Sequence, residues 1–247
     1  MLKFIFYMIT LFTIYNQPAF LIATPQFKHY EGDLHFDRLG FLKSKGFDPK
    51  VVYDIGAFKG YWSKSISEVF PNGKFFLFEA NSAHKLSLAS QPFPFYIAVL
   101  GDSNKLVSFF SNDSTGDSVF QEQTRFYVNG NQTEQKLQMT TLKDLVQKEK
   151  IPLPDLIKID VQGAEKLIVE GSPEIISHAE VVILETKILE YNKNAPFIIE
   201  MMSLMNSLGY RMMDILELHY LPSGELNEID VLYIKKNSPL IKTGILM

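Results

Sequence analysis

Short runs of apolar residues alternate along the chain with segments in which apolar residues recur at helical spacing. Residues 51–55 form a β-branched apolar run, and residues 61–70 then place apolar side chains along one side of a helix. Near the C-terminus two strands follow each other without a helix between them, so they should pair antiparallel. The predicted strands span residues 51–55, 74–80, 95–100, 106–110, 135–140, 155–160, 181–185, 209–215 and 229–234. With 106–110 and 135–140 assigned to an antiparallel insertion, this order predicts an α/β fold with a seven-stranded, mostly parallel sheet and an antiparallel last strand.

The first predicted strand ends at a glycine turn of the form Asp-x-Gly-x-x-x-Gly, made by Asp54, Gly56 and Gly60. Strand–turn–helix units of this kind hold nucleotide-like ligands at the C-terminal edge of open α/β sheets. The order differs from the Gly-x-Gly-x-x-Gly of dinucleotide sites, and an acid on the turn would repel a pyrophosphate. It would suit a nucleoside that carries a cationic amine, which is the character of S-adenosylmethionine. An ordinary βα turn with a helix-capping acid is the alternative.

The second predicted strand, residues 74–80, carries Glu79 near its end, about twenty residues after the glycine turn. A carboxylate at this place accepts hydrogen bonds from the two ribose hydroxyls of a bound nucleoside. The alternative is that it caps the next helix, for which Ser82 is a second candidate. The end of the third strand should approach the adenine ring, with Ala98 and Val99 as candidate backbone contacts.

A second polar strand end follows the apolar run near residue 157. Lys158, Asp160, Gln162 and Glu165 lie within eight residues there, and Glu185 ends the next strand. Because the C-terminal ends of central parallel strands face one crevice, we expect Asp160 and Gln162 to share a cleft with the first glycine turn. A buried charge is costly unless it is paired or used in function. A structural Lys158–Asp160 pair is therefore the alternative, since both side chains point to the same strand face.

The segment of residues 105–140 departs from the βα alternation. It predicts an antiparallel insertion whose polar loop, residues 114–118, is expected to close over the cleft. Before the first strand, apolar residues between 34 and 42 predict a short helix that caps the sheet or roofs the cleft. His29 and His35 show no tight metal-ligand spacing, so we expect them on the surface.

Composition limits the class of protein. The chain has 247 residues, of which 46% are hydrophobic, so it can bury the core of one α/β domain. The net charge is −4, and no basic field suggests nucleic acid as a partner. The absence of cysteine excludes disulfides, thiol nucleophiles and cysteine-ligated metals.

The N-terminal region is hydrophobic. Residues 4–15 have the length of a signal-peptide core and are short for a membrane span, and no good cleavage site follows them. We therefore expect residues 1–22 to pack on the domain or to anchor it at a membrane surface, in a cytoplasmic protein. The expected organisation is an extension over 1–45, a catalytic domain over 46–237 and a tail over 238–247.

At these residues the chain resembles the FkbM-type family of class I S-adenosylmethionine-dependent methyltransferases. The matching segments are Val52–Ala57 with Gly60 and Trp62, Phe78–Ala80, Thr141–Leu142, Ile157–Glu165 and Leu184–Glu185. The resemblance covers about residues 50–235, and Ile157–Glu165 is its most specific part. It implies a Rossmann-like fold, S-adenosylmethionine as cofactor, and O-methylation of a sugar, a glycan or another small-molecule hydroxyl.

The resemblance also implies roles for individual residues. Asp160 is the candidate general base or metal ligand, with Glu185 next. A divalent metal with Asp160 and Glu185 as carboxylate ligands is left open, because no histidine cluster supports it. The expected cofactor contacts are Asp54, Gly56, Ala57, Gly60, Trp62, Glu79, Ala98, Asp102 and Gln162. Two alternatives stay open: a catalytically idle nucleoside-binding module, and a nicotinamide-dependent oxidoreductase, which would need the missing glycine pattern.

Overall fold

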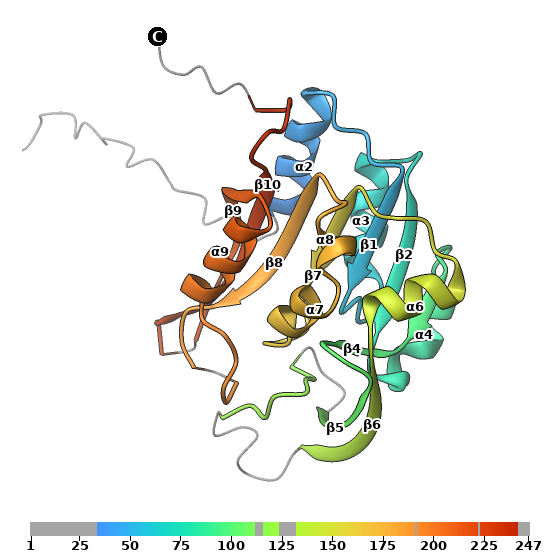
Figure 1. Cartoon of the computed structure of the whole chain (residues 1–247), viewed down its shortest axis with the longest axis vertical. Coiled ribbons are helices and arrows are strands. Elements are labelled where there is room, and N and C mark those ends of the chain that lie inside the picture. The colour runs from blue at the N-terminus through green and yellow to red at the C-terminus, as the bar shows by residue number, and fades with distance from the viewer. Residues whose placement is uncertain (1–33, 112–115, 124–131, 191, 222, 242–247) are drawn as a thin grey trace, which may run out of the picture. The chain divides into compact units, whose positions relative to one another are not determined.

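The computed structural model of the chain describes residues 34–111, 116–123, 132–190, 192–221 and 223–241 (Figure 1). Within this part, seven strands form one sheet in the order β3-β2-β1-β7-β8-β10-β9. These strands are β1 (Val51–Ile55), β2 (Lys74–Glu79), β3 (Phe95–Ile97), β7 (Leu156–Ile159), β8 (Val181–Lys187), β9 (Tyr210–Tyr220) and β10 (Leu226–Lys235). All neighbours are parallel except β10, which runs antiparallel to both β8 and β9. The predicted sheet is confirmed.

Helices cover both faces of this sheet (Figure 1). On one face pack α2 (Leu34–Ser44), α3 (Tyr61–Val69) and α4 (Lys85–Ala89), the last preceded by the 3₁₀ turn η1 (Ser82–His84). On the other face pack α6 (Leu142–Glu149), α7 (Glu165–Gly171), α8 (Pro173–Ile176) and α9 (Ile198–Ser207). Strand β8 serves both cores, because Val181 and Ile183 point to the first and Val182 and Leu184 to the second.

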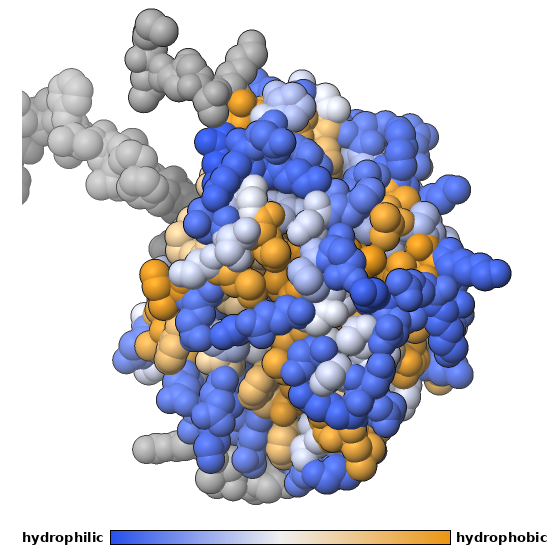
Figure 2. All heavy atoms as spheres, viewed as in Figure 1, coloured by the Kyte–Doolittle hydropathy of each residue, from blue (hydrophilic) through white to orange (hydrophobic). Residues whose placement is uncertain are grey.

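Burial on both faces explains why the sequences of the central strands are mostly apolar. Every residue of β1, β7 and β8 is buried, as expected for parallel strands covered by helices on two sides. On the face of the molecule seen in Figure 2, hydrophilic residues predominate and apolar residues form small patches between them. The apolar stripes of the helices are therefore turned largely inward.

The C-terminal hairpin is longer than predicted. Strand β9 continues to Tyr220 because it stays paired with β10 along its length. Glu217 and His219 therefore lie within β9, whereas the predicted strand ended at residue 215. Their register places Glu217 opposite Asp230 and His219 opposite Glu228.

The predicted strand over residues 95–100 is wrong as a single element. It divides into β3 and β4 (Val99–Gly101), and β4 belongs to a separate sheet of order β4-β6-β5. The break falls at Ala98, whose N–H donates to the carbonyl of Glu79 at 2.8 Å. The other two strands, β5 (Lys105–Ser111) and β6 (Thr133–Thr141), pair antiparallel, so the predicted insertion is confirmed.

The helix α2 packs against α3 and β9 and belongs to the compact unit that spans residues 33–247. The domain limits at 45 and 237 stay predictions. Several expectations lie outside the described residues: those for residues 1–22, for His29 and for the first part of the loop 114–118. In the part of the chain that is described, no helix has both the length and the apolar character needed to cross a membrane.

Candidate active site

A cavity of about 270 Å³ opens at the C-terminal edge of the large sheet. The strand ends of β1, β2, β7 and β8 meet there, and the hairpin of β9 and β10 closes one side. Its lining residues are Gly56, Phe58, Glu79, Ala80, His84, Asp117, Asp160, Val161, Gln162, Glu185, His219 and Glu228. Among the predicted site residues, it brings together Gly56, Glu79, Asp160, Gln162 and Glu185.

Glu79 ends β2 and faces this cavity. Its Oε2 accepts the backbone N–H of Phe58 at 2.7 Å, and its Oε1 accepts that of Asn81 at 2.7 Å. Burial raises the pKa of Glu79 to about 7, although these two hydrogen bonds favour the carboxylate. Glu79 does not cap the following turn, and neither does Ser82, because Asn81 Oδ1 accepts the N–H of Ala83 at 2.9 Å. The side chain of Glu79 is thus held rigidly with carboxylate lone pairs left for a ligand.

The glycine turn is shaped by the neighbouring strand. The N–H groups of Gly56 and Ala57 both donate to the carbonyl of Phe78. Gly56 has φ +80°, and a Cβ added there would lie 1.7 Å from the carbonyl oxygen of Asp160. Gly60, at φ +79°, precedes α3 and packs against the Leu77 side chain. Close approach of the chain after β7, together with positive φ, therefore requires glycine at position 56.

Several predicted cofactor contacts do not line the cavity. Asp54 is fully buried, its Oδ2 accepts the Ser63 hydroxyl at 2.6 Å, and burial raises its pKa. Its side chain supports α3 because the two-residue period of β1 turns it toward that helix. The Trp62 indole N–H donates to His35 Nδ1 at 3.1 Å. Ala98 lies at the break between β3 and β4, and Asp102 pairs with Lys105. Ala57 is buried in the turn.

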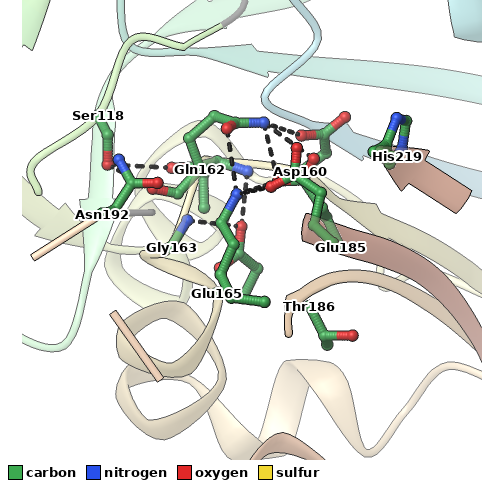
Figure 3. Close-up of polar contacts among 12 residues, drawn as sticks. Ser118, Asp160, Gln162, Gly163, Glu165, Glu185, Thr186, Asn192 and His219 are labelled. Atoms are coloured by element: carbon green, nitrogen blue, oxygen red, sulfur yellow. Dashed lines mark hydrogen bonds and ion pairs between the residues drawn. The ribbon is translucent and has the colours of Figure 1, made fainter. Parts of the chain in front are cut away.

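The strand ends of β7 and β8 supply the polar centre of the cavity (Figure 3). Asp160 Oδ2 lies 2.8 Å from Lys158 Nζ, so the pair weighed as the structural alternative is formed. The amide nitrogen of Gln162 donates to both oxygens of Glu185, at 2.9 and 2.8 Å, and lies 3.3 Å from Asp160 Oδ1. Gln162 therefore links the two candidate catalytic carboxylates.

Buried lysines balance part of this negative charge. Lys187 Nζ contacts Glu185 Oε2 at 3.1 Å and also pairs with Glu228. Burial would lower the pKa of Lys187, but Glu185 and Glu228 raise it above its usual range. For Glu185, burial and the nearby Asp160 raise the pKa well above its usual range despite Lys187. The site thus holds more acids than bases.

Glu165 is a loop-forming residue. Its Oε1 accepts the N–H groups of Val161 and Gly163 at 3.0 and 3.1 Å, and the residue is buried. These bonds hold the turn in which Gln162 takes φ +57° and Gly163 takes φ +101°. Ser118 adds a hydrogen bond from its hydroxyl to the Gln162 carbonyl at 2.8 Å. The turn presents Gln162 to the cavity.

Three polar residues that line the cavity were not singled out from the sequence: His84, His219 and Glu228. Asp117 also lines it and belongs to the loop 114–118, which was expected to close over the cleft. The prediction that His35 lies on the surface is wrong. His35 is 1% exposed, and its Nε2 lies 2.9 Å from Asp230 Oδ2. A polar residue facing inward on an amphipathic helix is a weak signal, and its partner lies 195 residues away in the sequence.

Comparison with protein-family models gives one match, the methyltransferase FkbM domain, over residues 54–212. The chain belongs to the FkbM methyltransferase family. The matched region contains the first glycine turn, the acidic end of β2 and the polar ends of β7 and β8. The resemblance drawn from the motifs is therefore confirmed. No curated protein matches this FkbM-family chain.

Solved structures of other methyltransferases are similar to this FkbM-family chain in fold. Precorrin-6y C5,15-methyltransferase from Geobacter metallireducens is 16% identical, with a TM-score of 0.43 over 81% of this chain and 87% of that one. The 1,6-didemethyltoxoflavin-N1-methyltransferase of Burkholderia thailandensis, solved with S-adenosylhomocysteine, is 10% identical, with a TM-score of 0.44 over 82% and 78%. Fibrillarin from Aeropyrum pernix, solved with S-adenosylmethionine, is 10% identical, with a TM-score of 0.44 over 80% and 74%.

Proposed function

We propose that this FkbM-family protein uses S-adenosylmethionine to methylate a hydroxyl group of a sugar, a glycan or another small molecule. The observation that carries the proposal is the acidity of the cavity at the C-terminal sheet edge. Five carboxylate side chains line it, those of Glu79, Asp117, Asp160, Glu185 and Glu228. When bound, the cofactor supplies an electrophilic methyl group on a sulfonium and carries a cationic amine. A cavity of this charge suits that ligand and disfavours the pyrophosphate of a nicotinamide cofactor.

The residues present fit the parts of the cofactor. Glu79 is fixed by two backbone N–H groups and offers lone pairs to the ribose hydroxyls. Gly56, at the end of β1, lines the cavity beside Glu79. Asp117 and Asp160 offer carboxylates on the cavity wall for a cationic amine. Asp54 does not lie on the cavity wall, because its side chain is buried beneath α3.

Asp160 is the candidate proton acceptor. Its side chain is 30% exposed, whereas that of Glu185 is 4% exposed and is held by Gln162. A hydroxyl acceptor beside Asp160 would form the new O–CH₃ bond as the electron pair of the old C–S bond returns to sulfur, and its proton would pass to the Asp160 carboxylate. Lys158, in contact with Oδ2, holds that carboxylate in position. Such base assistance contributes about 10²-fold or more to rate.

Calorimetry with the purified protein tests the cofactor assignment. Titration with S-adenosylhomocysteine should show one site, and NAD, in a parallel titration, should not bind. The acceptor class is then tested with methyl-labelled S-adenosylmethionine and a panel of saccharides, with amines as the comparison. Binding of NAD but not S-adenosylhomocysteine would overturn the cofactor assignment. Transfer to amines alone would overturn the assignment of O-methylation.

A further inference from the structure

A chain of hydrogen bonds beside the cavity fixes the proton on His35. The Trp62 indole nitrogen is a donor only, and it lies 3.1 Å from His35 Nδ1. Nδ1 is therefore the accepting nitrogen, and the Nε2–H of His35 donates to Asp230 Oδ2 at 2.9 Å. His35 thus has no ring lone pair to offer a ligand. Its role is to orient the Asp230 carboxylate.

The other oxygen of the Asp230 carboxylate, Oδ1, has no hydrogen-bond donor among the described residues. Asp230 is 3% exposed. A buried carboxylate oxygen in this condition is costly unless a ligand satisfies it. Nε2 of His219 lies 3.7 Å from Oδ1, which is within ion-pair distance for a protonated His219 but beyond hydrogen-bond distance.

Glu185 is the third residue, after His219 and Asp230, that offers a possible metal-ligand atom at this place. One ligand atom from each of Glu185, His219 and Asp230 can be chosen so that all three lie within 4.8 Å of one another. Glu185 and His219 both line the cavity, and Figure 3 shows His219 beside Asp160 and Glu185. Two ligand atoms about 2.1 Å from one ion lie at most about 4.2 Å apart, so only a small inward shift would close this set.

We propose that Glu185, His219 and Asp230 bind a divalent metal ion such as Mn²⁺ at the edge of the cavity. One imidazole and two carboxylates form a mixed nitrogen and oxygen set that suits a first-row divalent ion. The hydrogen bond from His35 to Asp230 is the outer support that ligating carboxylates commonly have. The wider surroundings favour a cation, since Asp160, Glu217 and Glu228 lie close by and the lysines among them are already paired with acids.

The metal site rests on its own geometry, whereas its role rests on the proposed function. An ion held by these three residues would lie beside Asp160, the candidate base. It would bind the acceptor hydroxyl oxygen as a Lewis acid and lower the pKa of that hydroxyl. An ion-paired carboxylate such as Asp160 would then suffice as the proton acceptor. The site therefore predicts a metal requirement for methyl transfer, with no requirement for cofactor binding.

Titration of the full, metal-free chain with Mn²⁺, followed by calorimetry and by the electron paramagnetic resonance of the free ion, tests the site. We expect one Mn²⁺ per chain. His219→Ala should weaken binding by about tenfold or more, the usual effect of disturbing a metal ligand or its support. His178→Ala is the matched control, because His178 contacts the carbonyl of Pro154, away from the cavity. Asp230→Asn, which keeps the shape of the side chain, should weaken binding as His219→Ala does.

Absence of Mn²⁺ binding to the wild-type chain, with Zn²⁺ and Mg²⁺ also unbound, would overturn the metal site. Equal affinities of wild type and His219→Ala would also overturn it. Titration of the same sample with S-adenosylhomocysteine separates the two proposals. Bound S-adenosylhomocysteine without bound metal would leave the proposed function standing, and bound metal without S-adenosylhomocysteine would leave only the site.

Discussion

Glu79 should make the stability of the protein depend on pH in a way that its amide variant does not. Burial raises the pKa of this carboxyl from an ordinary 4.5 to about 7 in the folded state. Between these two values the unfolded chain releases the proton while the folded chain keeps it. The free energy of unfolding therefore falls as pH rises through this window, and the stabilisation present below pH 4.5 is lost above about pH 7.

The size of this loss follows from the same two values. A difference of one pH unit corresponds to about 1.4 kcal/mol, so the full window is worth about 3 kcal/mol. Between about pH 5 and about pH 8 the loss should be about 2.5 kcal/mol. Glu79→Gln has no proton to release in this range. Its free energy of unfolding should therefore rise relative to that of wild type by about 2.5 kcal/mol between these conditions.

Urea unfolding at the two pH values measures this difference directly, by linear extrapolation. Other buried acids, such as Glu165, whose pKa burial raises to about 7, contribute to both proteins and cancel in the comparison. Glu68→Gln on the exposed side of α3 is the matched control and should follow wild type. Parallel pH profiles for wild type and Glu79→Gln would refute the reasoning, since they would show that Glu79 titrates alike in the folded and unfolded chain.

Two further predictions concern the strand ends. Gly56→Ala should destabilise the fold by more than about 4 kcal/mol in urea unfolding, because its Cβ would collide with the Asp160 carbonyl. Gly209→Ala shares positive φ but meets no atom within 4 Å, so it should cost only about 1–2 kcal/mol, and equal losses would contradict the collision. Asp160→Asn should lower the single-turnover rate of labelled methyl transfer by about 10²-fold while leaving S-adenosylhomocysteine affinity nearly unchanged. An unaltered rate would remove Asp160 from the role of base.

The sheet could be predicted because its central strands are buried on both faces. Strands of this kind consist of short apolar runs in the sequence, and β1, β7 and β8 lie where those runs occur. The exception is instructive. Residues 95–100 read as one apolar strand, but the chain breaks at Ala98 to pass from one sheet to another. No glycine or proline marks that break, so nothing local could reveal it.

The site could be predicted as far as chain topology determines it. Glu79, Asp160, Gln162 and Glu185 lie at strand ends, and the carboxyl ends of parallel strands meet at one edge. Asp54 looked equivalent in the sequence. It stands one residue before the end of β1, however, and the two-residue period turns its side chain beneath α3.

The other half of the site depends on the full length of the C-terminal hairpin and on one long-range contact, neither of which a local pattern records. His219 reaches the cavity because β9 pairs with β10 beyond the predicted strand end. His35 is buried because Asp230, on β10, accepts its hydrogen bond. The first is a hairpin pairing whose length was underestimated, whereas the second joins residues 195 positions apart in the chain. A histidine in a polar stretch is usually exposed, so only the assembled fold distinguishes these two from ordinary surface residues.

The charge arrangement links this hairpin to the proposed chemistry. Buried acids are costly, and the fold tolerates those at the ends of β7 and β8 because Lys158 and Lys187 are buried beside them. Each lysine is already committed to contacts with acids, Lys158 to Asp160 and Lys187 to Glu185 and Glu228. Five carboxylates line the cavity, and three of them, those of Asp160, Glu185 and Glu228, are the partners of these two lysines. A surplus of acid in such a site is most simply relieved by cationic ligands, and a sulfonium cofactor and a divalent metal ion are both of that kind.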